Sequence, residues 1–555
     1  MKRMPFQNIL LFVAVMVQLA FFIISCGGDN GDDADTDQNL PKFPPVIFIA
    51  DKDMDGTDEL YASFDDGTNI VKLSNTLVAG GDVVAFLVSP DGFFVAYVAD
   101  QDTDGVFELY TVVVDKTSGD TAIKVSGTMA GNGILLLPSG EYVFGWAPDS
   151  SRVAYIADQN TNGVFELFTS TPDGNANDLV SNLPDPSINP GRDVRDFEWE
   201  PKSGLVAYVA DQDANDKFEL YVSPSDSNIG NRKVSGIPMT GSGIREASPL
   251  PTGKFLFGWA SDSSRIAYIA DQDTTSIFEL FSSTPDGASI LKLSGPMGIG
   301  GNVDQFVWAP DNSKIGYLAD QLNDPGVELY TTLLDIPGSF LKNSTGLVVG
   351  SNVTEFKWAP DSSRIAFVAN KIVTRFALYT TSPNDSNNVL VSSNLLANSE
   401  IISFSWAPDS SRIAYIADEI SINVLELFTT RPAAPLINKI SGNLVAGGDV
   451  LNLEWAPNSS RVAYSADQED NEVFELYTST PDGSVNDIIS DVIVAGGDVQ
   501  DFKWAPDSSG VGYLADQDGD NVVELYASQP NGEENTKLSG TLVNGGNVFS
   551  FDWIP

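Results

Sequence analysis

The sequence contains no histidine, and this absence removes whole classes of chemistry. Without an imidazole the chain cannot build a Ser-His-Asp or Cys-His catalytic group, and it lacks the usual zinc ligands. Its one cysteine, Cys26, has no partner for an intrachain disulfide. Basic residues are scarce: 30 lysines and arginines stand against 76 acidic residues, a formal net charge of −46. Such a surface repels nucleic acid, so we expect no nucleic-acid partner.

A long apolar run occurs only at the N-terminus, in residues 1–25. Lys2 and Arg3 precede an apolar stretch that begins at Ile9, which is the pattern of a secretory signal peptide. The stretch ends in Ile-Ile-Ser-Cys and resembles a bacterial lipobox, which implies cleavage before Cys26 and a lipid on that cysteine. The alternative is an uncleaved transmembrane anchor. We expect a lipid-anchored protein of the bacterial cell envelope, facing the periplasm or the cell surface.

After Cys26 the sequence is rich in glycine and aspartate and then in proline, so 26–45 is predicted to be a flexible acidic tether. The folded body should occupy 46–555. There an aromatic-x-Ala-Asp phrase recurs ten times, with successive spacings of 48 to 60 residues. A period near 49 residues falls in the range of β-propeller blades. The phrase ends at Asp51, Asp100, Asp158, Asp211, Asp271, Asp320, Asn370, Asp418, Asp467 and Asp516.

One unit, 257–301, shows four short strand patterns: FGW, RIAYIA, FELFSS and ILKLSG. The second is apolar on both faces, as a strand covered on both sides requires. Pro-Asp turns separate the strands, and 46–555 shows no sustained helical period. The sequence therefore predicts an all-β fold, a β-propeller of four-stranded blades.

The two ends of the repeat array complement each other. The first unit begins at Val46 without an aromatic-x-Trp strand before it, and the last ends on Phe551 and Trp553 with no blade after them. A blade shared by both ends would pair an open edge strand and close one ring of about ten blades. Two tandem propellers of about five blades are the alternative.

The string WAPDSSRIAYIADQD, followed by ELYTSTPDG and KLSG, resembles the WD-like repeat of the TolB propeller and its relatives. The resemblance covers essentially all of 46–555 and implies the propeller fold. It leaves function open, because this repeat serves binding proteins, peptidase accessory domains and enzymes. The hairpin after Ala-Asp is longer here than in the family.

These longer hairpins carry acids at positions 1, 3, 5 and 9 in three units. Carboxylates on alternate residues of a tight loop suit Ca²⁺, and the spacing resembles the calcium hairpins of integrin-type propellers. Calcium is the one cofactor that the sequence predicts. The candidate ligands are Asp51, Asp53, Asp55 and Glu59; Asp100, Asp102, Asp104 and Glu108; and Asp516, Asp518, Asp520 and Glu524.

The alternative is that these hairpins are acidic turns without metal. Two units keep only the first and last acids, and the unit at Asn370 loses both, with Ala377 in the last position. That paired loss suggests that the first and last acids share a local role, such as hydrogen bonding to loop amides.

Other repeated residues are interpreted as structural. The tryptophans should pack blade against blade, and the arginines after Ser-Ser should pair with nearby acids. The tryptophans are Trp146, Trp259, Trp308, Trp358, Trp406, Trp455 and Trp504, and the arginines are Arg152, Arg265, Arg364, Arg412 and Arg461.

No catalytic residues are predicted, so the sequence favours a non-catalytic, membrane-anchored, TolB-like scaffold that binds a protein or a glycan. One alternative is an adhesive or structural surface protein stiffened by Ca²⁺. Another is a propeller glycan lyase or hydrolase, whose site would lie in the related insertions 127–142 and 236–255.

Overall fold

The chain divides into two units, Met1–Leu40 and Pro41–Pro555. The computed structural model describes residues 42–555 except 65, 116–121, 186–190, 237–240, 242, 249–251, 299, 322–325, 335, 348–349, 373–374, 394–398, 495 and 520. The expected signal peptide, Cys26 and most of the tether lie outside the described residues. Within the described part, no helix is long and apolar enough to cross a membrane.

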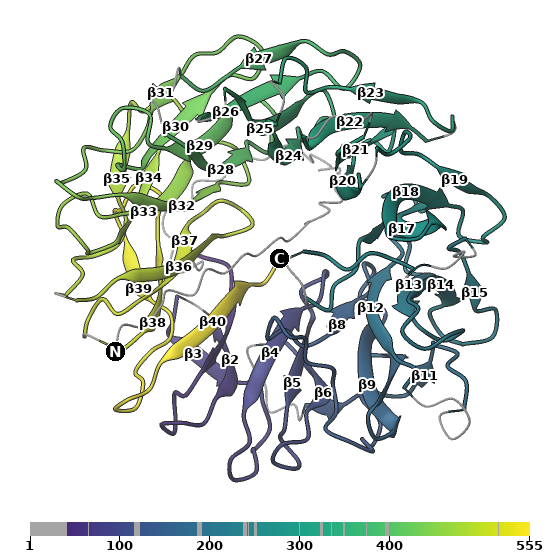
Figure 1. Cartoon of the computed structure of the whole chain (residues 1–555). Coiled ribbons are helices and arrows are strands. Elements are labelled where there is room, and N and C mark those ends of the chain that lie inside the picture. The colour runs from purple at the N-terminus through teal and green to yellow at the C-terminus, as the bar shows by residue number, and fades with distance from the viewer. Residues whose placement is uncertain are drawn as a thin grey trace, which may run out of the picture. The chain divides into compact units, whose positions relative to one another are not determined.

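The described body is a single ten-bladed β-propeller. Forty strands form ten antiparallel sheets of four strands each. Figure 1 shows the sheets following one another around a ring, with the first strand of each blade toward the centre and the fourth at the outside. The predicted propeller of four-stranded blades is confirmed, and the alternative of two tandem rings is wrong.

Blade 1 consists of β40 and β1–β3, blade 2 of β4–β7, and each later blade of the next four strands, up to β36–β39 in blade 10. The inner strands are β40 (Val548–Trp553), β4 (Val83–Val88), β8 (Phe144–Trp146), β12 (Val194–Trp199), β16 (Phe257–Trp259), β20 (Val303–Trp308), β24 (Val353–Trp358), β28 (Ile401–Trp406), β32 (Val450–Trp455) and β36 (Val499–Trp504). The second strands are β1 (Val46–Ala50), β5 (Phe94–Ala99), β9 (Val153–Thr161), β13 (Leu205–Ala210), β17 (Ile266–Thr274), β21 (Lys314–Ala319), β25 (Ile365–Ile372), β29 (Ile413–Ala417), β33 (Val462–Ala466) and β37 (Val511–Ala515). The third strands are β2 (Glu59–Phe64), β6 (Glu108–Val113), β10 (Val164–Ser170), β14 (Glu219–Pro224), β18 (Ile277–Ser283), β22 (Glu328–Leu333), β26 (Arg375–Thr381), β30 (Glu426–Thr430), β34 (Glu475–Ser479) and β38 (Glu524–Ser528). The outer strands are β3 (Asn69–Lys72), β7 (Ile123–Lys124), β11 (Asn177–Leu179), β15 (Arg232–Lys233), β19 (Ile290–Lys292), β23 (Phe340–Lys342), β27 (Asn388–Leu390), β31 (Asn438–Lys439), β35 (Asn486–Ile488) and β39 (Asn535–Lys537).

The core of each blade lies on its second and third strands, whose apolar side chains are covered on both faces by the neighbouring blades. All five residues of β1 and all six of β2 are buried. In every blade an aromatic residue of the second strand stacks on one of the third, as Tyr97 does on Tyr110 with ring centres 5.3 Å apart. Such offset pairs add to the burial of large apolar area.

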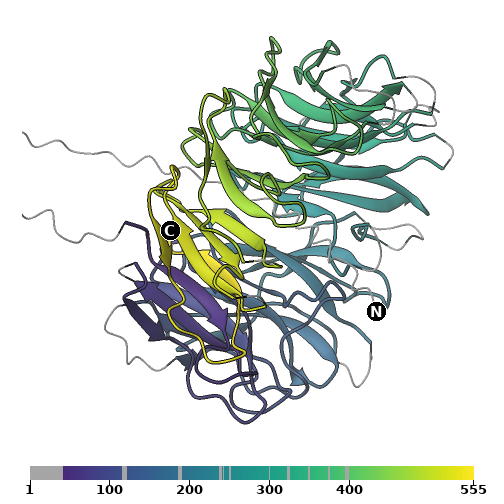
Figure 2. The same cartoon turned by 90° about the vertical axis from the view of Figure 1, so that its left-hand side faces the viewer.

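The ring closes as the ends of the sequence predict. Strand β40 pairs with β1, placing Trp553 opposite Val46 and Phe551 opposite Phe48. Yellow β40 therefore lies in the same sheet as the purple strands of blade 1 (Figures 1 and 2). Because this pairing covers the free edge of β1, blade 1 is built from both ends of the body.

The tryptophans hold successive blades in register, which confirms their predicted role. Each indole Nε1 donates to a backbone carbonyl on the inner strand of the preceding blade, as Trp504 does to Glu454 at 3.1 Å. The bond recurs for Trp146, Trp199, Trp259, Trp308, Trp358, Trp406, Trp455 and Trp553. Equivalent positions of neighbouring inner strands are thereby held at one level of the ring.

Among the arginines, Arg152 pairs with Asp178 at 2.8 Å and Arg461 with Asp487 at 2.7 Å, as predicted. Arg364 instead donates to the hydroxyl of Thr380, at 3.1 Å. Since Val389 stands in blade 7 where Asp178 stands in blade 3, that arginine has no acid at the equivalent position.

Candidate functional site

The first acid of each candidate calcium hairpin accepts backbone N–H groups with both carboxylate oxygens. Asp100 Oδ2 accepts the amide of Gly105 at 2.8 Å, and Oδ1 accepts the amide of Asp82 at 2.7 Å. Gly105 has a positive φ of 77°, which explains the glycine at this position. Asp51 bonds Gly56 and Asn547 in the same way, and Asp516 bonds Asn521 and Asp498. The first acid is therefore a turn cap that also fastens the strand entering the blade.

The last acid of each hairpin has a different role, because it binds side chains. Glu108 Oε1 lies 3.0 Å from Lys124 Nζ, and its other oxygen accepts the hydroxyl of Tyr110 at 3.1 Å. Glu524 lies 2.7 Å from both the ammonium of Lys537 and the hydroxyl of Tyr526. Glu59 is held likewise by Lys72 and Tyr61. The expectation that the first and last acids share one local role is therefore wrong.

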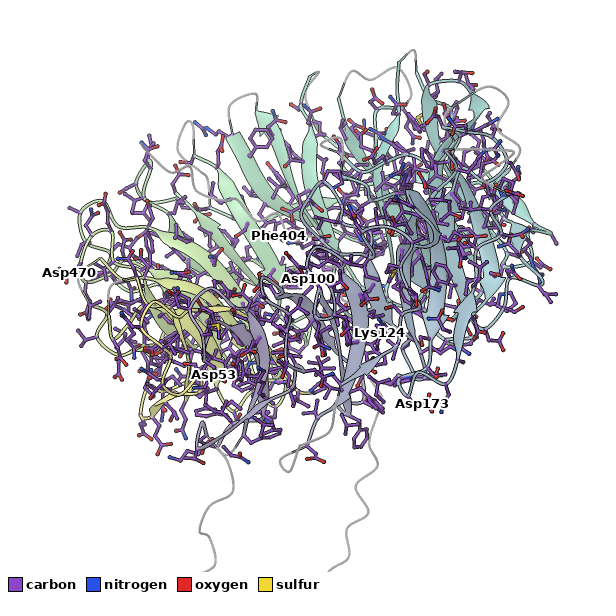
Figure 3. All side chains as sticks on the ribbon, turned by 90° about the horizontal axis from the view of Figure 1, so that it is seen from below. Asp53, Asp100, Lys124, Asp173, Phe404 and Asp470 are labelled. Atoms are coloured by element: carbon purple, nitrogen blue, oxygen red, sulfur yellow. The ribbon has the colours of Figure 1, made fainter. Side chains whose placement is uncertain are left out.

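The third position of the hairpin contacts the same lysine in two of the three loops. Asp102 lies 3.1 Å from Lys124 Nζ, and Asp518 lies 2.7 Å from Lys537 Nζ. An ammonium group from the outer strand thus stands between the acids at positions 3 and 9. Asp53, Asp55 and Asp104 are exposed, and Asp520 lies outside the described residues. Figure 3 labels Asp53, Asp100 and Lys124, and shows Asp470 of blade 9 projecting from the ribbon.

This arrangement does not fit a bound Ca²⁺. Calcium takes six to eight oxygen ligands, whereas the first and last acids of these hairpins, and the third-position acid in two of them, already accept N–H or O–H groups or face an ammonium. Within the described residues no three acidic side chains converge as a metal site would require. Calcium binding stays a prediction, which a comparison of melting temperatures in Ca²⁺ and in Mg²⁺ tests.

Blade 7 departs from this pattern. Asn370 keeps the first role, because its Oδ1 accepts the amide of Asn352 at 2.6 Å. Ala377 replaces the glutamate, and Leu390 takes the place of the outer-strand lysine opposite Tyr379. Blade 7 therefore lacks both the glutamate and its lysine partner. This joint replacement explains why the last acid of the hairpin is missing from this unit.

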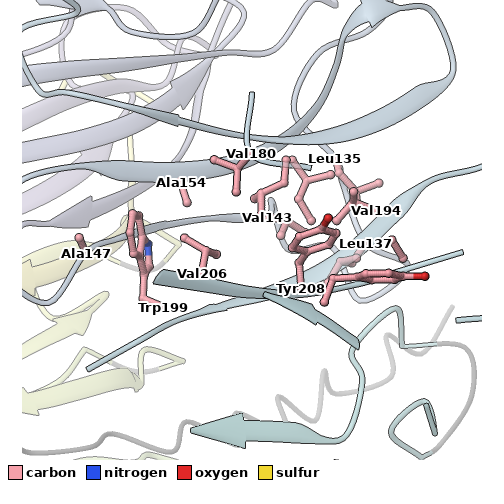
Figure 4. Packing of buried hydrophobic residues seen from close by; sticks show 14 residues of the cluster. Leu135, Leu137, Val143, Ala147, Ala154, Val180, Val194, Trp199, Val206 and Tyr208 are labelled. Atoms are coloured by element: carbon pink, nitrogen blue, oxygen red, sulfur yellow. The ribbon is translucent and has the colours of Figure 1, made fainter. Parts of the chain in front are cut away.

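The two long insertions come together. In blade 3, residues 134–143 form a small hairpin before β8, and Gly253 of the corresponding insertion in blade 5 approaches Leu137 closely. Leu135, Leu137 and Val143 pack on Val194 and Tyr208 of blade 4 (Figure 4). Both insertions therefore flank blade 4.

Blade 4 carries two acids that sequence reasoning missed, Asp196 and Glu198 on β12. Asp196 Oδ2 accepts the amide of Phe255 at 2.8 Å, and its other oxygen lies 3.7 Å from Lys254 Nζ. Burial raises the pKa of Glu198 to about 8. Two acids in the otherwise strand-like VRDFEW segment are the sequence signal for this pair.

An exposed apolar set also escaped sequence reasoning. The second residue of four inner strands is a large apolar side chain: Val84 is 38% exposed, Ile402 52%, Leu451 45% and Phe549 51%. We call these four residues the apolar rim. They belong to blades 8, 9, 1 and 2, four of five consecutive blades. The tryptophan bonds hold Ile402, Leu451 and Phe549 of blades 8, 9 and 1 at one level, and Val84 occupies the equivalent position of the next blade. The corresponding residues of β12, β20 and β24 are Arg195, Asp304 and Thr354.

The sequence matches no family model and no curated protein. Among solved structures, a eukaryotic initiation factor is similar over 92% of this chain and 99% of its own, at 10% identity and a TM-score of 0.48. A prolyl endopeptidase is similar over 64% of this chain and 50% of its own, at 12% identity and a TM-score of 0.37, so the chain spans half of that enzyme's length. A putative TolB from Agrobacterium tumefaciens is similar over 46% of this chain and 91% of its own, at 17% identity and a TM-score of 0.28. The neighbours thus include a TolB protein, the family that the repeat resembles. At these identities and TM-scores the similarities carry no argument about the function of this chain.

Proposed function

We propose that this protein is a non-catalytic binding scaffold of the bacterial envelope, anchored to a membrane by a lipid on Cys26. The apolar rim is the observation that supports a binding role. Four large apolar side chains exposed at the same position of their inner strands cost solvation free energy unless a partner covers them. Aliphatic side chains dominate the rim, which favours a protein over a glycan as the partner.

The acidic hairpins support the non-catalytic part of the proposal. Their repeated carboxylates bind amides, hydroxyls and ammonium groups of the same blade. Acids committed in this way stabilise the blades and are not available for proton transfer to a substrate.

The test is site-specific photo-cross-linking in cells. A photoreactive benzoylphenylalanine replaces Leu451 or Phe549 in the rim and, as matched controls, Ile229 or Val492, which are 83% and 87% exposed. We expect one discrete protein adduct from the rim positions and none from the controls. Equal labelling at all four positions would rule out the rim as the binding surface. Adducts competed by soluble oligosaccharide would point to a glycan instead.

A second candidate function is the glycan lyase or hydrolase, which the pair Asp196 and Glu198 beside the insertions favours. A carboxyl group whose pKa is raised to about 8 by burial holds a proton at neutral pH, as a general acid must. The test is the release of sugar ends from a polysaccharide panel by the wild type and by Glu198→Gln. Activity lost in the variant would replace the scaffold proposal by an enzymatic one.

A further inference from the structure

A carboxylate clamp recurs around the ring. Seven blades have a tyrosine at the stacked position of the third strand, and in six of them its hydroxyl donates to the glutamate two residues earlier. The clamped pairs are Tyr61 with Glu59 (2.8 Å), Tyr110 with Glu108 (3.1 Å), Tyr221 with Glu219 (3.0 Å), Tyr330 with Glu328 (3.4 Å), Tyr526 with Glu524 (2.7 Å) and Tyr477 with Glu475.

A lysine ammonium completes the clamp in five of these six blades. In blade 4, for example, Lys233 Nζ lies 3.0 Å from both oxygens of Glu219. The exception is blade 9, where Ile488 stands opposite Tyr477. The protein thus uses one hydroxyl and one ammonium to hold a carboxylate, and it does so repeatedly.

Blade 7 has the donors of this clamp without its carboxylate. The seventh tyrosine, Tyr379, has Ala377 two residues before it, and its hydroxyl has no hydrogen-bond partner within the described part of the chain. Lys371 Nζ lies 4.5 Å from the centre of the Tyr379 ring and donates to Asn388 Oδ1 at 2.8 Å. The ammonium therefore comes from the second strand here, while Leu390 stands where other blades have lysine.

A third donor, Arg375, lies on β26, the strand that also carries Tyr379. Arg375, Ala377 and Tyr379 alternate along β26 and so share one face. The buried Nε of Arg375 has no hydrogen-bond partner among the described residues. No carboxylate of the described residues contacts Lys371, and burial without such a partner lowers the pKa of its ammonium. The hairpin segment 370–377 is also the only one of the ten that contains no acidic residue.

In blade 7, the place that a glutamate side chain fills in other blades is open to solvent on the side of Tyr379. The other nine stacked aromatics of the third strands are buried, with exposures of 3% or less, whereas Tyr379 is partly exposed. Lys371 and Arg375 are partly exposed as well. A group from another molecule therefore has a route to these donors.

We propose that blade 7 binds a carboxylate supplied by another molecule, held by the Tyr379 hydroxyl, the Lys371 ammonium and the Arg375 guanidinium around Ala377. The ligand is a glutamate or aspartate side chain of a partner protein, because a tyrosine hydroxyl in six other blades, joined by a lysine ammonium in five of them, holds a glutamate side chain. This assignment rests on the proposed scaffold function and adds the chemistry of one contact.

The other blades indicate which substitution tests this proposal. Ala377→Glu restores the residue that nine blades carry, so its carboxylate should fill the clamp while the blade still folds. Thr103→Asp, in the exposed hairpin of blade 2, adds the same charge far from the clamp and is the matched control. Equal melting temperatures of the two variants and the wild type would show that folding is intact.

Binding is measured by fluorescence anisotropy on the purified full-length protein at about 150 mM salt, where exposed charges are screened beyond about 8 Å. The probe is a labelled Gly-Ser-Glu repeat peptide, with Gly-Ser-Gln as its neutral match. We expect Ala377→Glu to weaken binding of the glutamate peptide about tenfold or more, and Thr103→Asp to change it less than about twofold, because a charge-assisted pair is lost only in the first.

Equal binding by Ala377→Glu and the wild type would overturn the proposal. Binding of an oligogalacturonate probe but not of the peptide, with the same sensitivity to Ala377→Glu, would overturn the assignment to a protein side chain. Displacement by millimolar phosphate without any effect of Ala377→Glu would show a general anion effect and overturn it too. If the rim still cross-links a partner in these cases, the scaffold function stands and only the clamp assignment fails.

Discussion

Trp553 donates its indole N–H to the backbone carbonyl of Lys503 at 3.1 Å, the same bond that fastens eight other pairs of neighbouring blades. The seam at which the ring closes is therefore built like an ordinary seam. It differs only in that one of its blades takes strands from both ends of the body.

Removing residues 547–555 should destabilise the whole body. The deletion strips β40 from β1 and exposes apolar side chains of blade 1, including Phe48, whose ring is fully buried. We expect a lower free energy of unfolding, by more than about 4 kcal/mol, measured by urea unfolding. Trp553→Ala alone should cost about 3–5 kcal/mol. An unchanged unfolding midpoint would contradict closure by this strand.

Calcium should not stabilise the wild-type protein specifically. Because lysine ammonium groups stand between the acids of the hairpins, a divalent ion has to displace them first. We expect the melting temperature of metal-free protein to be the same in millimolar Ca²⁺ and in millimolar Mg²⁺. A rise with Ca²⁺ alone would show that the hairpins are ion sites after all.

Replacing Lys124 should destabilise the protein, because two acidic side chains lose the ammonium group that they contact. Lys124→Met leaves buried Glu108 with only the Tyr110 hydroxyl, and Asp102 loses its ion pair. We expect a loss of about 1–3 kcal/mol in the free energy of unfolding. In a double-mutant cycle with Glu108→Gln, the coupling free energy between the two substitutions should account for most of this loss. Lys42→Met, which removes an exposed ion pair with Glu534, is the control and should cost less than about 1 kcal/mol.

The stability of the seam between blades 9 and 10 should depend on pH. Burial raises the pKa of Glu454 to about 7, above the 4.5 of a free glutamate. The folded state therefore favours the protonated acid, and stability falls as pH rises from about 4.5 through about 7. Glu454→Gln should be more stable than the wild type by about 1–3 kcal/mol at about pH 8.5, and by little at about pH 4.5. A constant difference across this range, measured by urea unfolding, would contradict the mechanism. The exposed Glu533→Gln is the control.

Cys26→Ala should release the protein from membranes. If the lipid is the anchor, the wild type partitions with the membrane fraction and the variant is found in the soluble fraction. The measurement is fractionation of cells followed by immunoblotting. Retention of the variant in membranes would favour the uncleaved transmembrane anchor instead.

The repeat made the architecture predictable from particular residues. Phe551 and Trp553 identified the shared blade because a strand with no partner at one end matched a missing strand at the other. The candidate sites were less accessible, because they depend on which side chains meet. The pattern of acids at positions 1, 3, 5 and 9 suits calcium, but the outer-strand lysines that face them lie 13 to 16 residues further along, as Lys72 does from Glu59 and Lys124 from Glu108.

Other features were hidden for a similar reason. The change from glutamate to Ala377 was visible in the sequence, but its meaning required knowing that Tyr379 and Lys371 lie together. The apolar rim consists of residues far apart in the sequence, 49 positions between Ile402 and Leu451 and more between the others, which become neighbours only when the inner strands are aligned.

A blade assembled from both ends of the body also sets the order in which the protein can mature. While the chain is being made, nine blades can form in turn as their residues emerge. Blade 1 must wait, with the edge of β1 unpaired, until the segment around Phe551 arrives. Chains cut short before that point keep an open strand edge that proteases and other strands can reach. Completion of the ring therefore depends on the synthesis of this one strand, whose pairing with β1 ends the exposure of that edge.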